Sequence, residues 1–359
     1  MRFDLFNELS VPTNNGRTER QVFEDTQVQW VLGEALGFTT GWLVEHHFMP
    51  EYSHSTAPEL FLAAISQRTQ RLRLGHAIVP LPYHHPIRVA ERLSTLDILS
   101  GGRVEFGFGR GFSPQEYQAF GREMRDSRSY TEESLAVIRQ AFVDGRVDYH
   151  GQHFNFEGLK VLPRPLQQPH PPIWTAAVSP ESFTLAALQG IGVLVGPFKP
   201  WFMVREDIRR YREAWQSHHG SIIHSPQLNP RVAMTIGIHC HTNHRTAREE
   251  ARAGFVWFYR QLLGQTRGVL ENLYEGYEYY RQFGAFRNLM SKALTLGTLE
   301  TLGMTIVGNP AHCIERLSTI KKAGVDHVLL AFGAGVLPQA QTISAMRLFS
   351  EQVMPALNH

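Results

Sequence analysis

Short apolar runs alternate with longer amphipathic segments along most of this chain. Runs of about four to eight residues rich in Val, Ile, Leu and Phe suit strands that are buried on both faces. Apolar residues spaced three and four apart are typical of helices that pack through one face. This alternation predicts consecutive βα units, and therefore an α/β fold built on a parallel sheet.

The pattern predicts eight strands, at residues 2–6, 41–44, 72–77, 104–108, 173–176, 192–195, 231–239 and 327–331. The helices predicted between them lie at residues 22–36, 58–69, 86–99, 130–142, 181–189, 202–217 and 310–323. Gly37 and Gly324 are suitable helix stops. Eight strands with alternating helices favour a closed (β/α)8 TIM barrel over an open doubly wound sheet, although strand order is not readable from sequence.

Two segments depart from the repeat. Residues 149–172 are rich in Pro, Gly and aromatic residues, which predicts an irregular excursion with a short hairpin through residues 152–156. Residues 252–302 are longer than one crossover needs and are strongly aromatic, so we expect an insertion near the barrel mouth. Residues 1–359 are therefore expected to form a single domain with these two additions.

Composition and charge narrow the function classes. The chain has 359 residues, 43% of them hydrophobic and 19% charged, with a net charge of +2 and no basic tract, which argues against nucleic acid or an anionic membrane as a partner. Cys240 and Cys313 are far apart, which fits a reducing compartment without a disulfide. No long apolar stretch or signal peptide is visible, so we expect a cytoplasmic protein with a small-molecule ligand.

The most informative motif is Glu45-His46-His47-Phe48, directly after a predicted strand. Strand ends of a barrel point at the active site, so polar residues there favour function. Adjacent strand residues face opposite ways, so one of His46 and His47 points into the mouth, and the sequence alone does not say which. A zinc site is less favoured, because adjacent histidines cannot easily chelate one metal.

A glycine-rich loop carrying Arg110 follows the strand at residues 104–108. Glycine lets a ligand approach the backbone closely, and a guanidinium suits a phosphate. The loop is not a dinucleotide-binding fingerprint, because Phe112 stands where the third glycine would be. The sequence shows no NAD(P)H-binding fingerprint elsewhere either.

Two further motifs have ordinary structural explanations beside the functional ones. Ser179 and Pro180 suit the N-cap and first turn of a helix, where an anion can also bind, although capping alone explains the serine. His239 and His241 have the spacing of a metal-binding pair, with His244 nearby. No carboxylate cluster supports a metal at the other strand ends, so a metal-dependent hydrolase is a minor alternative.

Taken in order, these segments resemble the bacterial luciferase-like family of flavin-dependent monooxygenases, including the luciferase α subunits. The resemblance rests on residues 45–48, 77–82, 85–88, 96–97, 101–103, 109–111, 120–121, 127–128, 177–179, 307–310 and 323–328. Only residues 252–302 lack a match. Two residues depart from the family. Gly109 stands in place of a reactive cysteine, which argues against light emission tuned as in luciferase. Val178 stands in place of a glutamate that contributes mainly its backbone groups.

The resemblance implies roles for individual residues. His46 matches the catalytic histidine, Arg110 and Arg128 match the arginines that hold the FMN phosphate, and a cis peptide is expected between Ala77 and Ile78. The implied cofactor contacts are Ala77, Ile78, Gly109, Arg110, Phe112, Arg128, Ala176, Ala177, Val178, Ser179 and Ser182. The candidates for the substrate pocket are Phe6, Glu45, His47, Phe48, Phe198 and Trp201.

The resemblance also implies a reaction. Reduced FMN, supplied by a separate flavin reductase, would use dioxygen through a flavin C4a-peroxide on a small apolar substrate, by hydroxylation, Baeyer–Villiger insertion or heteroatom oxidation. A homodimer is the simplest assembly. Two alternatives remain open: a deazaflavin-dependent oxidoreductase that transfers hydride on the same barrel, and a non-catalytic flavin-binding partner subunit. The identity of the substrate is not readable from the sequence.

Overall fold

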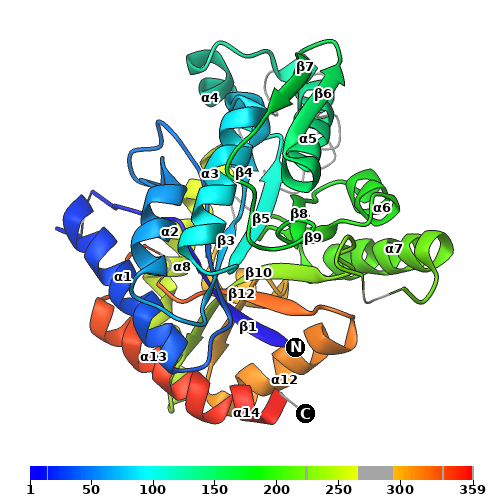
Figure 1. Cartoon of the computed structure of the whole chain (residues 1–359). Coiled ribbons are helices and arrows are strands. Elements are labelled where there is room, and N and C mark those ends of the chain that lie inside the picture. The colour runs from blue at the N-terminus through cyan, green and yellow to red at the C-terminus, as the bar shows by residue number, and fades with distance from the viewer. Residues whose placement is uncertain (14, 223–224, 266–293, 334, 358–359) are drawn as a thin grey trace.

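A closed barrel of eight parallel strands is the framework of the molecule. The computed structural model describes residues 1–13, 15–222, 225–265, 294–333 and 335–357. Within them the barrel strands are β1 (Arg2–Asn7), β2 (Thr40–Leu43), β3 (Arg73–His76), β5 (Val104–Gly109), β8 (Ile173–Ala176), β9 (Gly192–Val195), β10 (Val232–Cys240) and β12 (His327–Ala331). They pair in this order, and β12 pairs again with β1, so the predicted barrel is confirmed (Figure 1).

The helices surround the barrel and follow the predicted pattern. The seven predicted helices are α1 (Glu19–Ala35), α2 (Pro58–Ser66), α3 (Pro86–Leu99), α5 (Ser127–Asp144), α6 (Pro180–Leu188), α7 (Trp201–His219) and α12 (Pro310–Lys322). The sequence pattern missed α4 (Pro114–Ala119), α8 (His244–Gln265), α11 (Leu296–Thr301), α13 (Gln339–Gln352) and α14 (Met354–Leu357). Among the described helices, none is long and apolar enough to cross a membrane.

The two irregular segments are only partly as predicted. In the excursion, β6 (Arg146–His150) and β7 (Asn155–Lys160) form an antiparallel hairpin that extends beyond the expected residues 152–156 on both sides. In the insertion, α8 runs on to Gln265 and α11 follows at Leu296, while the aromatic run between them falls on residues 266–293, outside the described residues.

Two short strands were not predicted. β4 (Val79–Pro80) pairs with β5, and β11 (Thr305–Gly308) pairs with the last residues of β10. β4 has only two residues, too few to show a periodic pattern in the sequence, so its pairing depends on the tertiary structure around it.

Large aromatic side chains fill the inside of the barrel. Trp42 on β2 and Trp174 on β8 are fully buried and meet edge to face, with ring centroids 5.5 Å apart. A Cβ atom on Gly75 would lie 2.2 Å from the Trp42 ring, so β3 has to carry glycine opposite this indole. The barrel is therefore a packed core below its mouth, as closed eight-strand barrels usually are.

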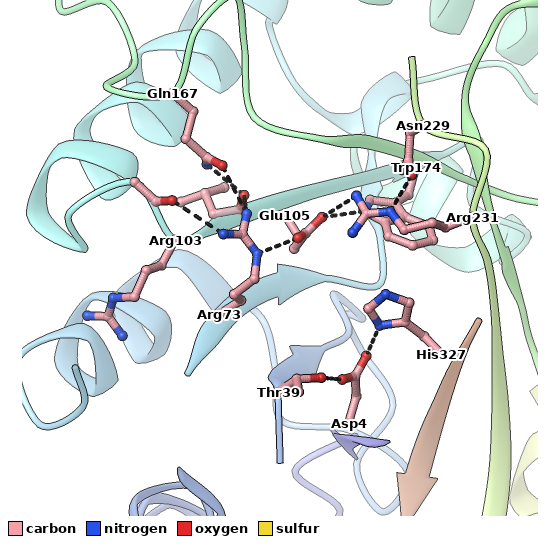
Figure 2. Close-up of polar contacts among 12 residues, drawn as sticks. Asp4, Thr39, Arg73, Arg103, Glu105, Gln167, Trp174, Asn229, Arg231 and His327 are labelled. Atoms are coloured by element: carbon pink, nitrogen blue, oxygen red, sulfur yellow. Dashed lines mark hydrogen bonds and ion pairs between the residues drawn. The ribbon is translucent and has the colours of Figure 1, made fainter. Parts of the chain in front are cut away.

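Asp4 is buried inside the barrel with a complete set of partners. Its carboxylate accepts a hydrogen bond from Trp42 Nε1 at 2.9 Å. It also accepts hydrogen bonds from His327 Nδ1 at 2.8 Å and from the Thr39 hydroxyl (Figure 2). Burial opposes ionisation of this carboxyl, but the positive charge and hydrogen bond of His327, with the hydrogen bonds of Thr39 and Trp42, outweigh it and lower the pKa of Asp4. The carboxylate thereby ties β1 to β2 and β12.

Glu105 on β5 is a second buried carboxylate whose hydrogen bonds link neighbouring strands. It accepts hydrogen bonds from Trp174 Nε1 at 2.6 Å and from the Arg73 guanidinium, and Arg231 lies 3.6 Å away (Figure 2). The Arg231 guanidinium also stacks over the Trp174 ring, 4.7 Å from its centroid. These bonds link β3, β5 and β8 near their amino ends, so the polar network stabilises the end of the barrel opposite the mouth.

We predict that Asp4→Asn lowers the free energy of unfolding by about 3 kcal/mol at pH 7, because a neutral amide oxygen cannot replace the carboxylate as acceptor of three buried hydrogen bonds. The folded pKa of Asp4 lies below its ordinary value of 3.8, so its contribution is present above that pH and is lost as the pH falls further. Denaturant titration at pH 7 and at pH 3 measures both effects. The exposed control Asp144→Asn should change stability by less than about 0.5 kcal/mol. An Asp4→Asn protein as stable as the parent at pH 7 would contradict this account of the network.

Candidate active site

A cavity of about 840 Å³ opens at the carboxyl ends of the barrel strands. Residues from or just after each of the eight strands line it: Phe6, Val44, Ala77, Gly109, Ala176, Val195, Thr235 and Leu329. Helices α5 and α6 contribute the rest of one side. The volume suits a ligand of cofactor size, and the position is the usual active-site end of a barrel.

Most of the sequence-predicted site residues meet in this cavity. Those that line it are Phe6, Glu45, His46, Ala77, Ile78, Gly109, Arg110, Phe112, Arg128, Ala176, Val178, Ser179, Ser182 and Phe198. Four predicted residues lie outside the lining: Ala177, His47, Phe48 and Trp201. The strand ends thus bring together residues that are up to 192 positions apart, from Phe6 to Phe198.

The four residues outside the lining have other surroundings. Ala177 is buried and donates its backbone N–H to Leu194 O at 3.0 Å. Phe48 is 48% exposed and packs against Phe120 on the surface. Trp201 begins α7 and packs against the main core. The fourth residue, His47, contacts Glu45 and packs against Phe120.

His46 is the histidine that faces the cavity. Its ring packs between Tyr52 and Phe112, with centroid distances of 5.6 and 5.7 Å. Its Nδ1 lies 3.4 Å from Glu116 Oε1. The His47 ring instead contacts Glu45 at 3.1 Å and the edge of Phe120. The geometry therefore resolves the choice that the strand alternation left open.

Three buried carboxyl groups surround His46. Glu116 accepts hydrogen bonds from the His47 backbone N–H at 2.7 Å and from the Tyr83 hydroxyl at 3.0 Å. Glu45 lies 3.1 Å from His47 Nε2 and 2.6 Å from His84 Nε2. The third carboxyl belongs to Glu8, which accepts a hydrogen bond from the Tyr52 hydroxyl at 2.9 Å.

The surroundings of these groups set their charges. Burial raises the pKa of Glu8 to about 7 against the opposing effects of His46 and Tyr52. Burial also opposes ionisation of Glu45, but its two histidine contacts lower its pKa to about 2. For His46, burial disfavours the charged ring, yet the hydrogen bond and charge of Glu116, with the charges of Glu8 and Glu45, raise the pKa above its ordinary 6.5. His46 is thus held in a state that can carry a proton near neutral pH.

The other end of the cavity is suited to an anion. Ser179 caps α6 by accepting the Ser182 N–H at 3.2 Å, so the positive end of the helix dipole faces the cavity. Arg128 lies at this end, since it pairs with Glu181 in the first turn of α6, and Arg110 lines the same cavity. The Arg128 side chain is half exposed and pairs with Glu181 at 3.0 Å, so an incoming anion would compete with that carboxylate.

The Ser182 hydroxyl is less available to an anion than its motif suggested. It donates to Ser179 O at 2.6 Å and accepts the Val178 N–H at 3.1 Å. Its proton is therefore used within the first turn of α6. The Ser179 side chain, the helix N-terminus and the two arginines are the stronger candidates for an anion.

Ala77, Ile78 and Gly109 form the wall between the two ends. The peptide bond between Ala77 and Ile78 is cis, as expected from the resemblance. A Cβ atom on Gly109 would lie 3.0 Å from Ile78 Cδ1 and 3.3 Å from Ala176 Cβ. Glycine at this position leaves a flat surface that a planar ring could approach.

Several lining residues were missed by the sequence analysis. Glu8 directly follows β1, so the rule that strand ends carry functional groups could have identified it. Tyr52 and Glu116 lie on a loop and on the unpredicted helix α4, and no sequence signal connects them to His46. They reach the cavity only through the tertiary structure.

The histidines of the possible metal motif have separate partners. His239 is buried and contacts Glu250 at 2.7 Å, while His241 Nδ1 accepts the Asn243 N–H at 3.0 Å. The His244 and His312 rings meet edge to face, with centroids 5.1 Å apart. Within the described part of the chain, no group of three or more His, Cys, Asp or Glu side chains is arranged to hold a metal ion.

Comparisons with known proteins agree with this architecture. The alkanal monooxygenase alpha chain of the Kryptophanaron alfredi symbiont is 27% identical over 336 residues, which cover 90% of each chain. The crystal structure of monooxygenase RslO1 from Streptomyces bottropensis superposes with a TM-score of 0.82 at 26% identity, covering 99% of this chain and 100% of that one. The oxygenating constituent of 3,6-diketocamphane monooxygenase from Pseudomonas putida, solved with FMN, has the same fold, with a TM-score of 0.76 at 19% identity and coverage of 99% and 98%.

The family match covers most of the sequence. The model of the luciferase-like monooxygenase family matches residues 1–327, which include seven of the eight barrel strands, the first residue of β12 and every cavity-lining residue named above except Leu329. The resemblance drawn from the motifs is therefore confirmed. The chain belongs to the luciferase-like monooxygenase family and is a flavin-dependent oxidoreductase of the monooxygenase type.

Proposed function

We propose that this enzyme is a monooxygenase that uses reduced FMN and dioxygen on a small apolar organic molecule. The observation that carries the proposal is a single cavity with two chemically different ends. His46 and its carboxyl neighbours form one end, and Arg110, Arg128 and the N-terminus of α6 form the other. An FMN molecule has the matching polarity, with a phosphate dianion at one end and a planar ring at the other.

The residues present fit FMN in both respects. Hydrogen bonds from guanidinium groups to a phosphate contribute roughly 1.5 to 3 kcal/mol each, and Arg110 and Arg128 can both supply them. The flat wall at Ala77, Ile78 and Gly109 suits the ring. The FMN complex of the diketocamphane monooxygenase, which shares the fold, supports this choice of cofactor.

The chain's own residues would orient the reactants and control one proton. Reduced flavin, when bound, supplies the electrons that activate dioxygen. His46 would hold a proton at the ring side of the cavity, with Glu116 fixing the orientation of the imidazole through Nδ1. Phe6, Phe112 and Phe198 line the mouth with apolar surface that excludes water.

A separate flavin reductase would supply the reduced cofactor, because the sequence contains no NAD(P)H-binding fingerprint.

The rival function is hydride transfer by a deazaflavin on the same barrel. The motif Glu45-His46-His47-Phe48 together with Arg128 favours FMN. A non-catalytic partner subunit is less favoured, because the buried carboxyl groups around His46 would have no purpose in a protein that only binds flavin.

We predict that Arg110→Gln and Arg128→Gln each weaken the binding of FMN about tenfold or more, because each removes a charged donor to the phosphate. Fluorescence titration measures the dissociation constants. Riboflavin, which has no phosphate, is the matched ligand control and should bind all three proteins alike. Equal FMN affinity in the parent and both variants would remove these arginines from the phosphate site.

We predict that His46→Ala binds FMN normally but alters the rate at which bound reduced FMN is reoxidised by dioxygen. In the parent protein that rate should change with an apparent pKa above 6.5, since Glu116 helps to keep His46 protonated. Glu116→Gln removes this charge and should move the inflection to lower pH. Stopped-flow absorbance across pH 5.5 to 9 measures both. A pH profile that is the same in all three proteins would show that His46 does not titrate in the reaction.

A further inference from the structure

The cavity has an arm that the proposed reaction does not use. It continues from the anion-binding end along α5 and α6, and we call it the α5/α6 arm (both helices are labelled in Figure 1). Leu135, Ala136 and Arg139 line it from α5, and Leu185 and Ala186 line it from α6. Apart from Arg139 these are aliphatic side chains, so this part of the arm favours an apolar ligand.

Arg139 is too far along α5 to take part in phosphate binding at Arg128. The two residues are eleven positions apart on one helix, which corresponds to about 16 Å at 1.5 Å per residue. Arg128 lies in the first turn of α5, beside the phosphate end, whereas Arg139 lies three turns further along the arm. The arm therefore has a cationic group of its own.

The guanidinium of Arg139 makes no hydrogen bond or ion pair with the described residues, and its Nε atom is buried without a partner. Burial lowers the pKa of Arg139, although an arginine remains charged. Burial also lowers the pKa of His170, and the charge of Arg139 adds to that effect. Glu132 lines the same cavity two turns earlier on α5 but forms no ion pair with Arg139.

A half-buried cation without a partner is unfavourable, because it loses hydration and gains no hydrogen bonds in return. Buried arginines are therefore normally paired with a carboxylate or a phosphate. The aliphatic walls beside Arg139 favour a carboxylate over a phosphate. Inorganic phosphate or a polar phosphoester has no apolar surface to pack against Leu135 and Leu185. A carboxylate on an alkyl chain satisfies both the cation and the walls.

We propose that the α5/α6 arm is a binding site for a small aliphatic carboxylic acid, whose carboxylate pairs with Arg139 and whose chain lies along the leucine and alanine walls. The planar guanidinium matches a carboxylate through two parallel hydrogen bonds. The arm is continuous with the mouth, so the acid and a flavin occupy different parts of one cavity. This inference does not depend on which flavin binds at the mouth.

Calorimetric titration of the full chain with octanoate tests the proposal, with and without saturating FMN. Two matched ligands accompany it: 1-octanol has the chain without the charge, and acetate has the charge without the chain. The parent protein should bind octanoate more tightly than either. Arg139→Gln should weaken octanoate binding by about tenfold to a hundredfold and leave 1-octanol binding unchanged. Arg205→Gln, at an exposed position of α7 outside the cavity lining, should behave like the parent.

Thermal unfolding separates this role from a structural one. Because Arg139 has no partner to lose among the described residues, Arg139→Gln without ligand should unfold at the same temperature as the parent or higher. FMN affinity should be the same in both proteins. The proposal is overturned if the parent and Arg139→Gln bind octanoate with equal affinity. It is also overturned if the parent binds 1-octanol or acetate as tightly as octanoate, or if FMN displaces octanoate.

Discussion

The structure depends on closing eight parallel strands around a filled interior that contains two buried carboxylates. Asp4 and Glu105 each accept a hydrogen bond from an indole N–H and from a second nitrogen donor, His327 or Arg73, and these contacts run between strands that are far apart in the sequence. Hydrogen bonds of this kind tolerate little change in strand position, because a buried carboxylate that loses a partner is costly. The network therefore holds the strands together at the amino end of the barrel, and the active-site residues stand at the opposite, carboxyl ends of the same strands.

The cavity built on this framework separates opposite charges. Three carboxyl groups gather around His46, while two arginines and the N-terminus of α6 gather at the other end. The carboxyl groups favour a protonated imidazole, and the basic end favours an anion. A flavin fits this arrangement with its phosphate at the basic end and its ring beside His46. We therefore regard orienting the flavin as the main contribution of the protein.

Much of this could be predicted from sequence because buried parallel strands are short apolar runs, and all eight barrel strands follow that pattern. The residues directly after strands, such as His46 and Arg110, could be assigned to the mouth by the same rule. Phe48 and Trp201 were assigned by residue type alone, and they pack elsewhere. Glu116 and Arg139 could not be predicted, because they stand on helical faces whose orientation depends on the packing of α4 and α5 around the barrel.

The most direct test of the account is to mix the protein and photoreduced FMN with aerated buffer and to follow the absorbance by stopped flow. Oxygenase chemistry in a cavity whose mouth is lined with apolar side chains predicts a long-lived transient whose spectrum differs from those of reduced and oxidised FMN. Reoxidation at the rate of free reduced FMN, with no such transient, would contradict the proposed function and would favour hydride transfer by a deazaflavin.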